Sequence, residues 1–245
     1  MKALVMLIFI LCIAVSILFA DTCVRHQVHT DGYYYGGRVN PPVDREYEVW
    51  FGTGKIAYMH ERRSVLFDLD KSIMTFVNLE DSTYVVSPIP FEWTKLLVPQ
   101  DTARVLMYQT VGEISKTDGK KKVLDRKCMG YTMCTWIPYE GGRVYETDAT
   151  VWVTSDVPFN LELYEMSIGH RLQLQNYKST FIDEMNKIKG YPLLSEESRF
   201  VKGFSVKSFD RVVEILEKDP PAGVYAIPAG FTKKAQLGIG DLRGG

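Results

Sequence analysis

Side chains that could catalyse a reaction are few and widely spaced in this sequence. The four histidines are His26, His29, His60 and His170, and neither a Gly-x-Ser-x-Gly elbow nor a complete phosphate-binding loop accompanies them. A Ser-His-Asp arrangement assembles in space rather than in sequence, so a hydrolase stays an alternative if His60 or His170 reaches a serine and a carboxylate. The sequence itself predicts no catalytic residue and a protein that is not an enzyme.

Two groups of residues resemble metal ligands, but their spacing argues against a metal site. Cys23, His26 and His29 lie close in sequence, yet the two histidines would face opposite sides of a strand and no fourth ligand is near. We therefore expect an exposed N-terminal segment there. Asp68-Leu69-Asp70 begins like a calcium loop but lacks the later oxygen ligands and the glycine. We predict neither a metal nor another cofactor.

The first twenty residues are typical of a leader for export. Lys2 precedes an uncharged, almost wholly apolar run from Ala3 to Ala20, which is the layout of a secretory signal peptide. Cleavage after Ala20 is the favoured outcome. An uncleaved membrane anchor over residues 3–20 is the alternative, because eighteen apolar residues can just span a bilayer. Either outcome predicts a periplasmic, secreted or membrane-anchored protein.

Export makes disulfide bonds possible for Cys23, Cys128 and Cys134. Cys128 and Cys134 lie six positions apart in a segment that favours a strand, which places them roughly 20 Å apart at about 3.3 Å per residue. A bridge from Cys23 to one of these two is therefore favoured, and three free thiols are the alternative.

Composition limits the class of protein. Lys plus Arg number 29 against 30 for Asp plus Glu, so no basic excess indicates nucleic acid as a partner. Hydrophobic residues make up 46% of the chain, which is enough for a sizeable core, and 12% aromatic residues favour strands.

The pattern along the chain predicts a mainly β fold with some helix, formed by a single curved antiparallel sheet. Apolar and polar residues alternate from residue 44 onward between short turn signals. We expect one domain over residues 21–232 and a loose tail over 233–245. The expected strands include 102–116 and 122–137, joined by a hairpin at Thr117-Asp118-Gly119, and 143–154 and 204–216. The expected helical segments are 158–166, 172–189 and a lid between Pro88 and Pro99.

A curved sheet capped by helices can enclose an apolar cavity for a lipophilic ligand. Aromatic residues on the strands and in the lid are the candidates to line it, and the alternative is a core filled by these same side chains. The candidate ligand-binding residues are Trp50, Tyr58, Phe67, Phe76, Phe91, Trp93 and Trp152.

Several short motifs together resemble periplasmic proteins of the LolA/LolB-like superfamily, and in particular an uncharacterised branch of it. The motifs are EVWFGTGKI at 48–56, LFDLDK at 66–71, MTFVN at 74–78, RKCMGY at 126–131, TVWVT at 150–154, KGYP at 189–192 and AIPAGF at 226–231. The resemblance implies a half-open β-barrel with helices covering its concave face. It also implies an apolar cavity for acyl chains or lipoproteins. A second reading is an envelope sensor of the same fold that binds a protein partner.

Overall fold

The computed structural model describes residues 20–201 and 203–242. The predicted signal peptide or anchor at residues 1–20, with Cys12, lies outside the described residues apart from Ala20. The strands are β1 (Asp21–Thr30), β2 (Tyr33–Tyr35), β3 (Arg38–Asn40), β4 (Val43–Gly52), β5 (Lys55–Met59), β6 (Arg63–Asp68), β7 (Ile73–Asn78), β8 (Thr83–Pro88), β9 (Val111–Val123), β10 (Arg126–Tyr139), β11 (Gly142–Thr154), β12 (Tyr191–Val201), β13 (Phe204–Lys218) and β14 (Thr232–Lys233). The helices are α2 (Trp93–Leu96), α3 (Pro99–Met107), α4 (Leu161–Leu174), α5 (Ser179–Met185) and α6 (Ile239–Leu242).

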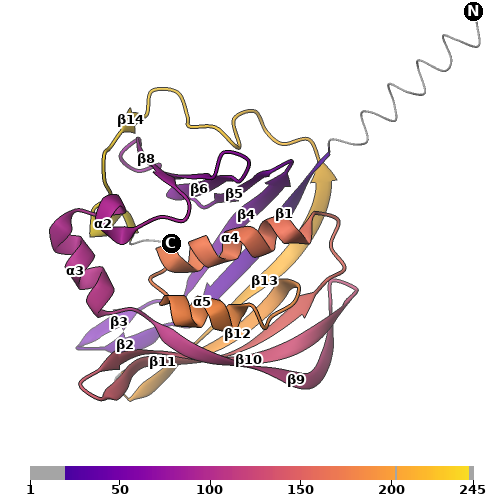
Figure 1. The fold of residues 1–245 in the computed structure, drawn as a ribbon. Coiled ribbons are helices and arrows are strands. Elements are labelled where there is room, and N and C mark those ends of the chain that lie inside the picture. Colours follow the sequence, from indigo (N-terminus) through magenta and orange to yellow (C-terminus); the bar gives the residue numbers. More distant parts are fainter. Residues whose placement is uncertain (1–19, 202, 243–245) are drawn as a thin grey trace, which may run out of the picture.

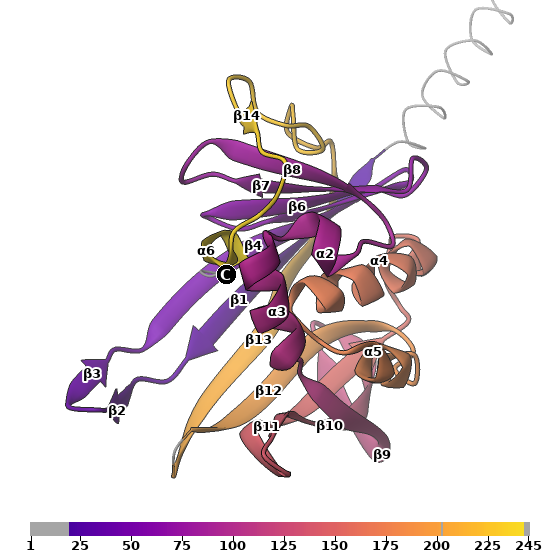
Figure 2. The same ribbon diagram turned by 60° about the vertical axis from the view of Figure 1, so that its left-hand side comes forward.

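One open sheet of twelve strands dominates the fold, as a mainly β sequence predicts (Figure 1). The order across it is β14-β8-β7-β6-β5-β4-β1-β13-β12-β11-β10-β9, and every neighbouring pair is antiparallel except β14 and β8. β1 pairs with β4 on one side and with β13 on the other, so it joins the early and late halves of the chain. Strands β2 and β3 form a separate hairpin that extends away from the main sheet (Figure 2).

Alternating side chains give the early half of the sheet two different apolar faces. On one face a row of directly paired residues crosses six strands and belongs to the largest apolar cluster: Val24, Val49, Tyr58, Val65, Phe76 and Val85. On the other face Cys23, Trp50, Ala57 and Leu66 form a second cluster. A side-chain period of two separates these sets, because successive residues of a strand point to opposite faces.

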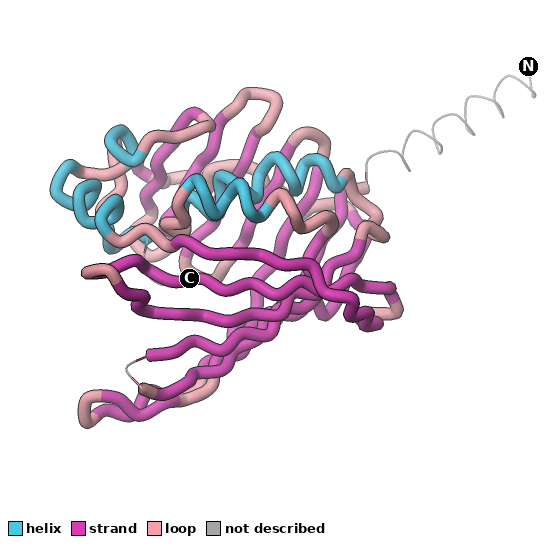
Figure 3. Tube along the Cα trace, turned by 60° about the horizontal axis from the view of Figure 1, so that its bottom comes forward, coloured by secondary structure: helices cyan, strands magenta, loops and turns pink. Residues whose placement is uncertain are grey.

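Helix α4 runs across the first of these faces, which we call the helix-side face, and α5 packs beside α4 against β9 (Figures 1 and 3). Asn160 caps α4 by accepting a hydrogen bond from the backbone N–H of Glu162 at 3.0 Å. The helix expected over 172–189 is interrupted at Asn176, which has a left-handed φ of 67°. The Asn176 side chain donates to the carbonyl oxygens of Val105 and Tyr108, so the end of α3 holds this break in place.

The strand predicted over 102–116 is wrong in its first half, because α3 occupies Pro99–Met107. The apolar run Val105-Leu106-Met107-Tyr108 resembles a short strand in sequence. Pro99 stands in the first turn, where proline suits a helix because its missing N–H needs no partner there. The lid predicted between Pro88 and Pro99 contains the short helix α2.

The hairpin expected at Asp118-Gly119 lies instead at Leu124-Asp125, where both residues have positive φ. Two successive positive φ values are typical of the tight turns that join antiparallel strands. Gly119 stays inside β9, and a Cβ there would stand 3.2 Å from the ring of Trp152. The absence of a side chain at Gly119 therefore allows the Trp152 ring to pack there, and Gly119 does not form a turn.

The tail expected to be loose after residue 232 is held to the sheet as far as Leu242. Thr232 and Lys233 form β14 beside β8, and Lys234 contacts the carboxylates of Asp81 and Asp241. Leu237 is only 1% exposed and packs in the helix-side cluster. Before this segment, Val224 and Tyr225 cover the opposite face of the sheet. Among the described residues, no helix has the length and apolar character needed to span a membrane.

Candidate functional site

Five of the seven aromatic residues predicted to line a cavity meet in one cluster on the helix-side face. Tyr58, Phe67 and Phe76 come from β5, β6 and β7, while Phe91 and Trp93 lie just before and at the start of α2. All five are buried. Two pairs of rings are in contact, with Tyr58 edge-on to Phe67 and Phe91 edge-on to Trp93. These residues form an aromatic layer between the sheet and the helices.

The other two predicted residues differ, because Trp50 lies on the opposite face of the sheet and Trp152 packs, partly buried, against the helix-side cluster. Trp50 belongs to the cluster on the opposite face, and its Nε1 donates to Glu48 at 2.9 Å. Trp152 lies over Gly130, where a Cβ would stand 3.0 Å from its ring, and its Nε1 donates to Glu196 at 3.1 Å. Trp50 therefore lies outside the aromatic layer, whereas Trp152 borders the cluster to which the layer belongs.

A buried polar cluster, which we call the His26 cluster, borders the aromatic layer. His26 was expected to be exposed, but it is only 5% exposed because β1 lies in the middle of the sheet. Its Nδ1 lies 2.8 Å from Asp210 Oδ1 and its Nε2 lies 2.8 Å from the Tyr191 hydroxyl. Tyr47 donates to Asp210 Oδ2 at 2.7 Å and stacks on His26. The four side chains satisfy one another, as buried polar groups generally do.

This cluster does not have the geometry that the hydrolase alternative requires. Both ring nitrogens of His26 are engaged, and Tyr191 is 2% exposed, so no substrate atom reaches either group. Burial also raises the pKa of Tyr191 well above its usual value, which makes it a poor nucleophile. Among the described residues, neither His60 nor His170 hydrogen-bonds through its ring to a serine or a carboxylate.

Arg171 enters the same region from α4. Its guanidinium carbon lies 4.7 Å from the centre of the Tyr58 ring. Burial lowers the pKa of Arg171, but Tyr47, Tyr58, Tyr164 and Asp210 outweigh this effect, and the net pKa is raised. Asp210 is the carboxylic acid of these four groups, and its lowered pKa makes it the one that supplies negative charge. Arg171 is therefore a cation in a largely apolar setting.

His60 and Asp210 respond to this cation in opposite ways. His60 stacks on Tyr47 at 4.6 Å, and burial, followed by the charges of Arg171 and Arg63, lowers its pKa to about 3. His60 is thus neutral at physiological pH. Burial raises the pKa of Asp210, but hydrogen bonds from His26 and Tyr47 and the charge of Arg171 outweigh burial and lower it. Asp210 is thus ionised.

An open groove of about 1330 Å³ lies along β9–β13. Phe209, Leu194 and Val213 contribute apolar surface, while Lys121 and Glu196 pair across two intervening strands at 3.2 Å. Charges of both signs border the groove, so it carries no single electrostatic preference. It is a second candidate binding surface, and the sequence analysis did not identify it.

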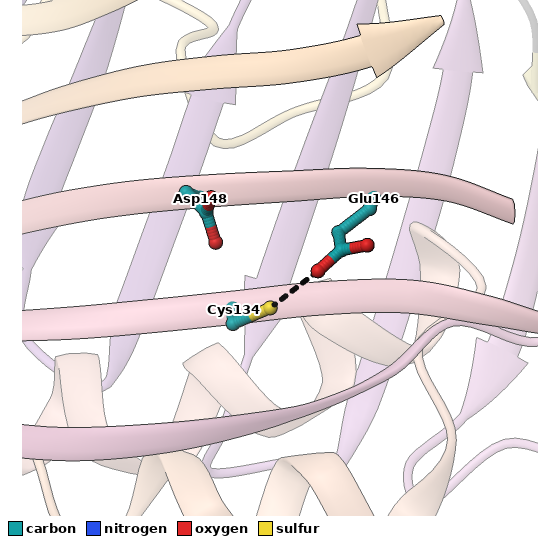
Figure 4. Close-up of side chains that lie close together, drawn as sticks. All are labelled: Cys134, Glu146 and Asp148. Atoms are coloured by element: carbon teal, nitrogen blue, oxygen red, sulfur yellow. Dashed lines mark hydrogen bonds between the residues drawn. The ribbon is translucent and has the colours of Figure 1, made fainter. Parts of the chain in front are cut away.

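Cys134, Glu146 and Asp148 form a small group on β10 and β11 beside this groove (Figure 4). One potential ligand atom from each residue lies within 4.8 Å of the others, so their geometry could hold a cation. The Cys134 thiol lies 3.6 Å from Glu146 Oε1 as a donor. Burial, followed by Asp148 and Glu146, raises the pKa of this thiol to about 11. A metal would have to displace that proton, because thiolate rather than thiol is the ligand.

The three described cysteines are free thiols. Cys23 packs on the face opposite the helices, whereas Cys128 belongs to the helix-side cluster. The favoured bridge from Cys23 to Cys128 or Cys134 is therefore not present in this structure, which has the alternative of three free thiols.

Comparisons with known proteins do not assign this chain to a family. No family model and no curated protein matches the chain. Among solved structures, one match is a DUF1329 family protein from Desulfovibrio piger, at 10% sequence identity and a TM-score of 0.21. That match covers 86% of this chain and 93% of the other. At this TM-score the likeness is weak, and the site must be interpreted from its own residues.

Proposed function

We propose that this protein is exported to the periplasm or beyond and binds an acyl chain or another lipophilic molecule without catalysis. In this proposal the sheet acts as a half-open barrel whose concave side is covered by helices, as the superfamily resemblance implies. The observation that carries the proposal is the aromatic layer, which spans β5–β7 and continues into α2. Layers of this kind bind acyl chains by burying apolar surface.

The α2 segment is the part of the cover best suited to move. The helix has four residues, and no side chain caps its N-terminus. Its Trp93 is 5% exposed, yet the indole Nε1 is buried with no hydrogen-bond partner among the described residues. An unsatisfied buried donor costs about 1–3 kcal/mol. Moving this segment away from the core therefore costs less free energy than moving a segment whose buried polar groups are all hydrogen-bonded.

Fluorescence of two matched tryptophan variants tests the proposal. Delipidated protein should respond saturably to a long-chain fatty acid, and its melting temperature should rise because the ligand binds only the native state. Trp93→Phe should weaken the fluorescence response, whereas Trp50→Phe, on the opposite face, should preserve it. Mass spectrometry of protein from an exporting host should also detect a copurified lipid. Absence of both the saturable response and a copurified lipid would refute lipid binding.

The groove along β9–β13 supports a second candidate function, an envelope module that binds a protein partner. Its mixture of exposed apolar and oppositely charged side chains is typical of surfaces that recognise proteins. The two functions are distinguished by variants, because Phe209→Ser in the groove should reduce partner binding and leave the fluorescence response to fatty acid unchanged.

A further inference from the structure

Arg171 is a partly buried cation without a counter-ion in contact. Among the described residues, no carboxylate lies within 4.0 Å of its guanidinium, and its side-chain hydrogen bond goes to the neutral Tyr47 hydroxyl. Asp210 is the acid that acts on Arg171, but its two oxygens already accept from His26 and Tyr47. Burying a charge without a counter-ion in contact is costly, so such residues commonly serve a ligand.

Two further arginines add positive charge to this region. Arg63 donates to the carbonyl oxygen of Leu242 at 2.8 Å, and neither Arg63 nor Arg45 forms an ion pair within the described part of the chain. Burial, followed by the charges of Arg171 and Arg45, lowers the pKa of Arg63. Arg171 and Arg45 therefore both repel the charge of Arg63, with the ionised Asp210 offsetting one positive charge. An incoming anion would relieve that repulsion.

A pocket of about 260 Å³ borders this region. Arg45 and His60 line it, and the ring of His60 rests on Tyr47 of the His26 cluster. Asp44 and Glu46 also border the pocket, but they contact His29 and Arg25 respectively. The exposed Glu61 completes its acidic border.

Arg171 also adjoins the aromatic layer directly. It lies over Tyr58, whose ring is 6.0 Å from that of Phe67. An anion held by the guanidinium would consequently have apolar aromatic surface beside it. This is the arrangement that an amphiphile needs, because its charged head and its chain require adjacent and different surroundings.

We infer that Arg171 binds the oxyanion head group, a carboxylate or a phosphate, of an amphiphile whose acyl chain lies against Tyr58 and Phe67. This inference rests on the proposed function and specifies its ligand class. Arginine suits the role because its planar fork can donate two parallel hydrogen bonds to either oxyanion. His60 is neutral beside Arg171. It therefore does not act as a second buried cation that could bind the anion in place of Arg171.

Three ligands with the same twelve-carbon chain test the inference: laurate, dodecyl phosphate and 1-dodecanol. Their dissociation constants are measured by titration calorimetry on delipidated protein. A hydrogen bond to a charged group is worth about 1.5–3 kcal/mol, so wild type should bind one of the anions about 10- to 100-fold more tightly than dodecanol. The preferred anion distinguishes a carboxylate from a phosphate head group.

Arginine variants separate the head-group contact from chain binding. Arg171→Gln should abolish the preference for the anion and leave dodecanol affinity unchanged, while Arg171→Lys should retain part of it through its charge. Arg104→Gln is the matched control, because Arg104 is exposed on α3 and should behave like wild type. Thermal melting of each variant verifies that it is folded.

The outcomes distinguish the inference from the proposed function. Equal affinity of wild type for all three ligands, or a preference that survives in folded Arg171→Gln, would overturn the head-group inference and leave lipid binding intact. Lack of saturable binding by any of the three would overturn both. If Arg171→Gln does not fold, unchanged selectivity in Arg171→Lys together with unchanged selectivity in Arg63→Gln would also overturn the inference.

Discussion

Asp210→Asn should destabilise the protein, because this carboxylate links the His26 cluster to Arg171. Asp210 accepts from His26 at 2.8 Å and from Tyr47 at 2.7 Å. Asparagine keeps one acceptor oxygen and presents an amide donor to the other partner, so one of these charge-assisted hydrogen bonds is lost. Such a bond is worth about 1.5–3 kcal/mol. Loss of the negative charge also leaves Arg171 without electrostatic compensation, and we expect a total loss of about 2–4 kcal/mol.

A double-mutant cycle isolates the second contribution. In an Arg171→Gln background no uncompensated cation remains, so Asp210→Asn should cost about 0.5–1.5 kcal/mol less than in wild type. Urea unfolding followed by circular dichroism gives each free energy of unfolding. Asp44→Asn is the matched control, because Asp44 also contacts a histidine at 2.8 Å but its side chain is 70% exposed. Equal costs of Asp210→Asn in both backgrounds would show that Asp210 and Arg171 do not interact.

Two further predictions concern titration and thiol chemistry. Because the pKa of His60 falls to about 3 on folding, the folded state binds fewer protons, and stability should decrease as pH falls below the unfolded pKa of about 6.5. In urea unfolding, the loss of free energy of unfolding should be at most about 1.4 kcal/mol per pH unit, and His60→Gln should make this loss smaller. A pH profile that the substitution leaves unchanged would contradict burial of His60. The native protein should label slowly at all three thiols, since Cys23 and Cys128 are 0% and 2% exposed and the pKa of Cys134 is raised to about 11. Denatured, unreduced protein should then be labelled at Cys23, Cys128 and Cys134, and a disulfide-linked peptide that joins two of these residues would contradict the structure.

Local alternation predicts the early half of this sheet well because each strand there pairs with its sequence neighbour. From β4 to β8 the strands follow one another through short turns, and the aromatic side chains at alternate positions fall on one face. The late half is harder, since the position of a turn depends on contacts from another strand. Gly119 resembles a turn residue beside Asp118, yet its small size accommodates Trp152 from β11. No pattern within β9 contains that information.

The candidate site depends even more on distant pairing. His26 and Asp210 are 184 positions apart, and Arg171 comes from a helix between them in sequence. No local motif marks these three residues as neighbours. A buried site can be predicted from these residues only when the pairing of β1 with β13 is known, because this pairing buries the Asp210 carboxylate beside the His26 imidazole.

One part of the site could nevertheless have been found from alternation alone. Val24, His26 and Val28 occupy every second position, so a strand through them places the histidine on the same face as two apolar residues. Interpreting residues 23–29 as an exposed segment gave more weight to its polar residues than to that period. A histidine on an apolar strand face needs buried partners for both ring nitrogens, which predicts a carboxylate or hydroxyl on an adjoining element. The two partners observed are Asp210 from the adjoining β13 and Tyr191 from β12 beyond it, so the period identifies the need for such groups but not their positions in the sequence.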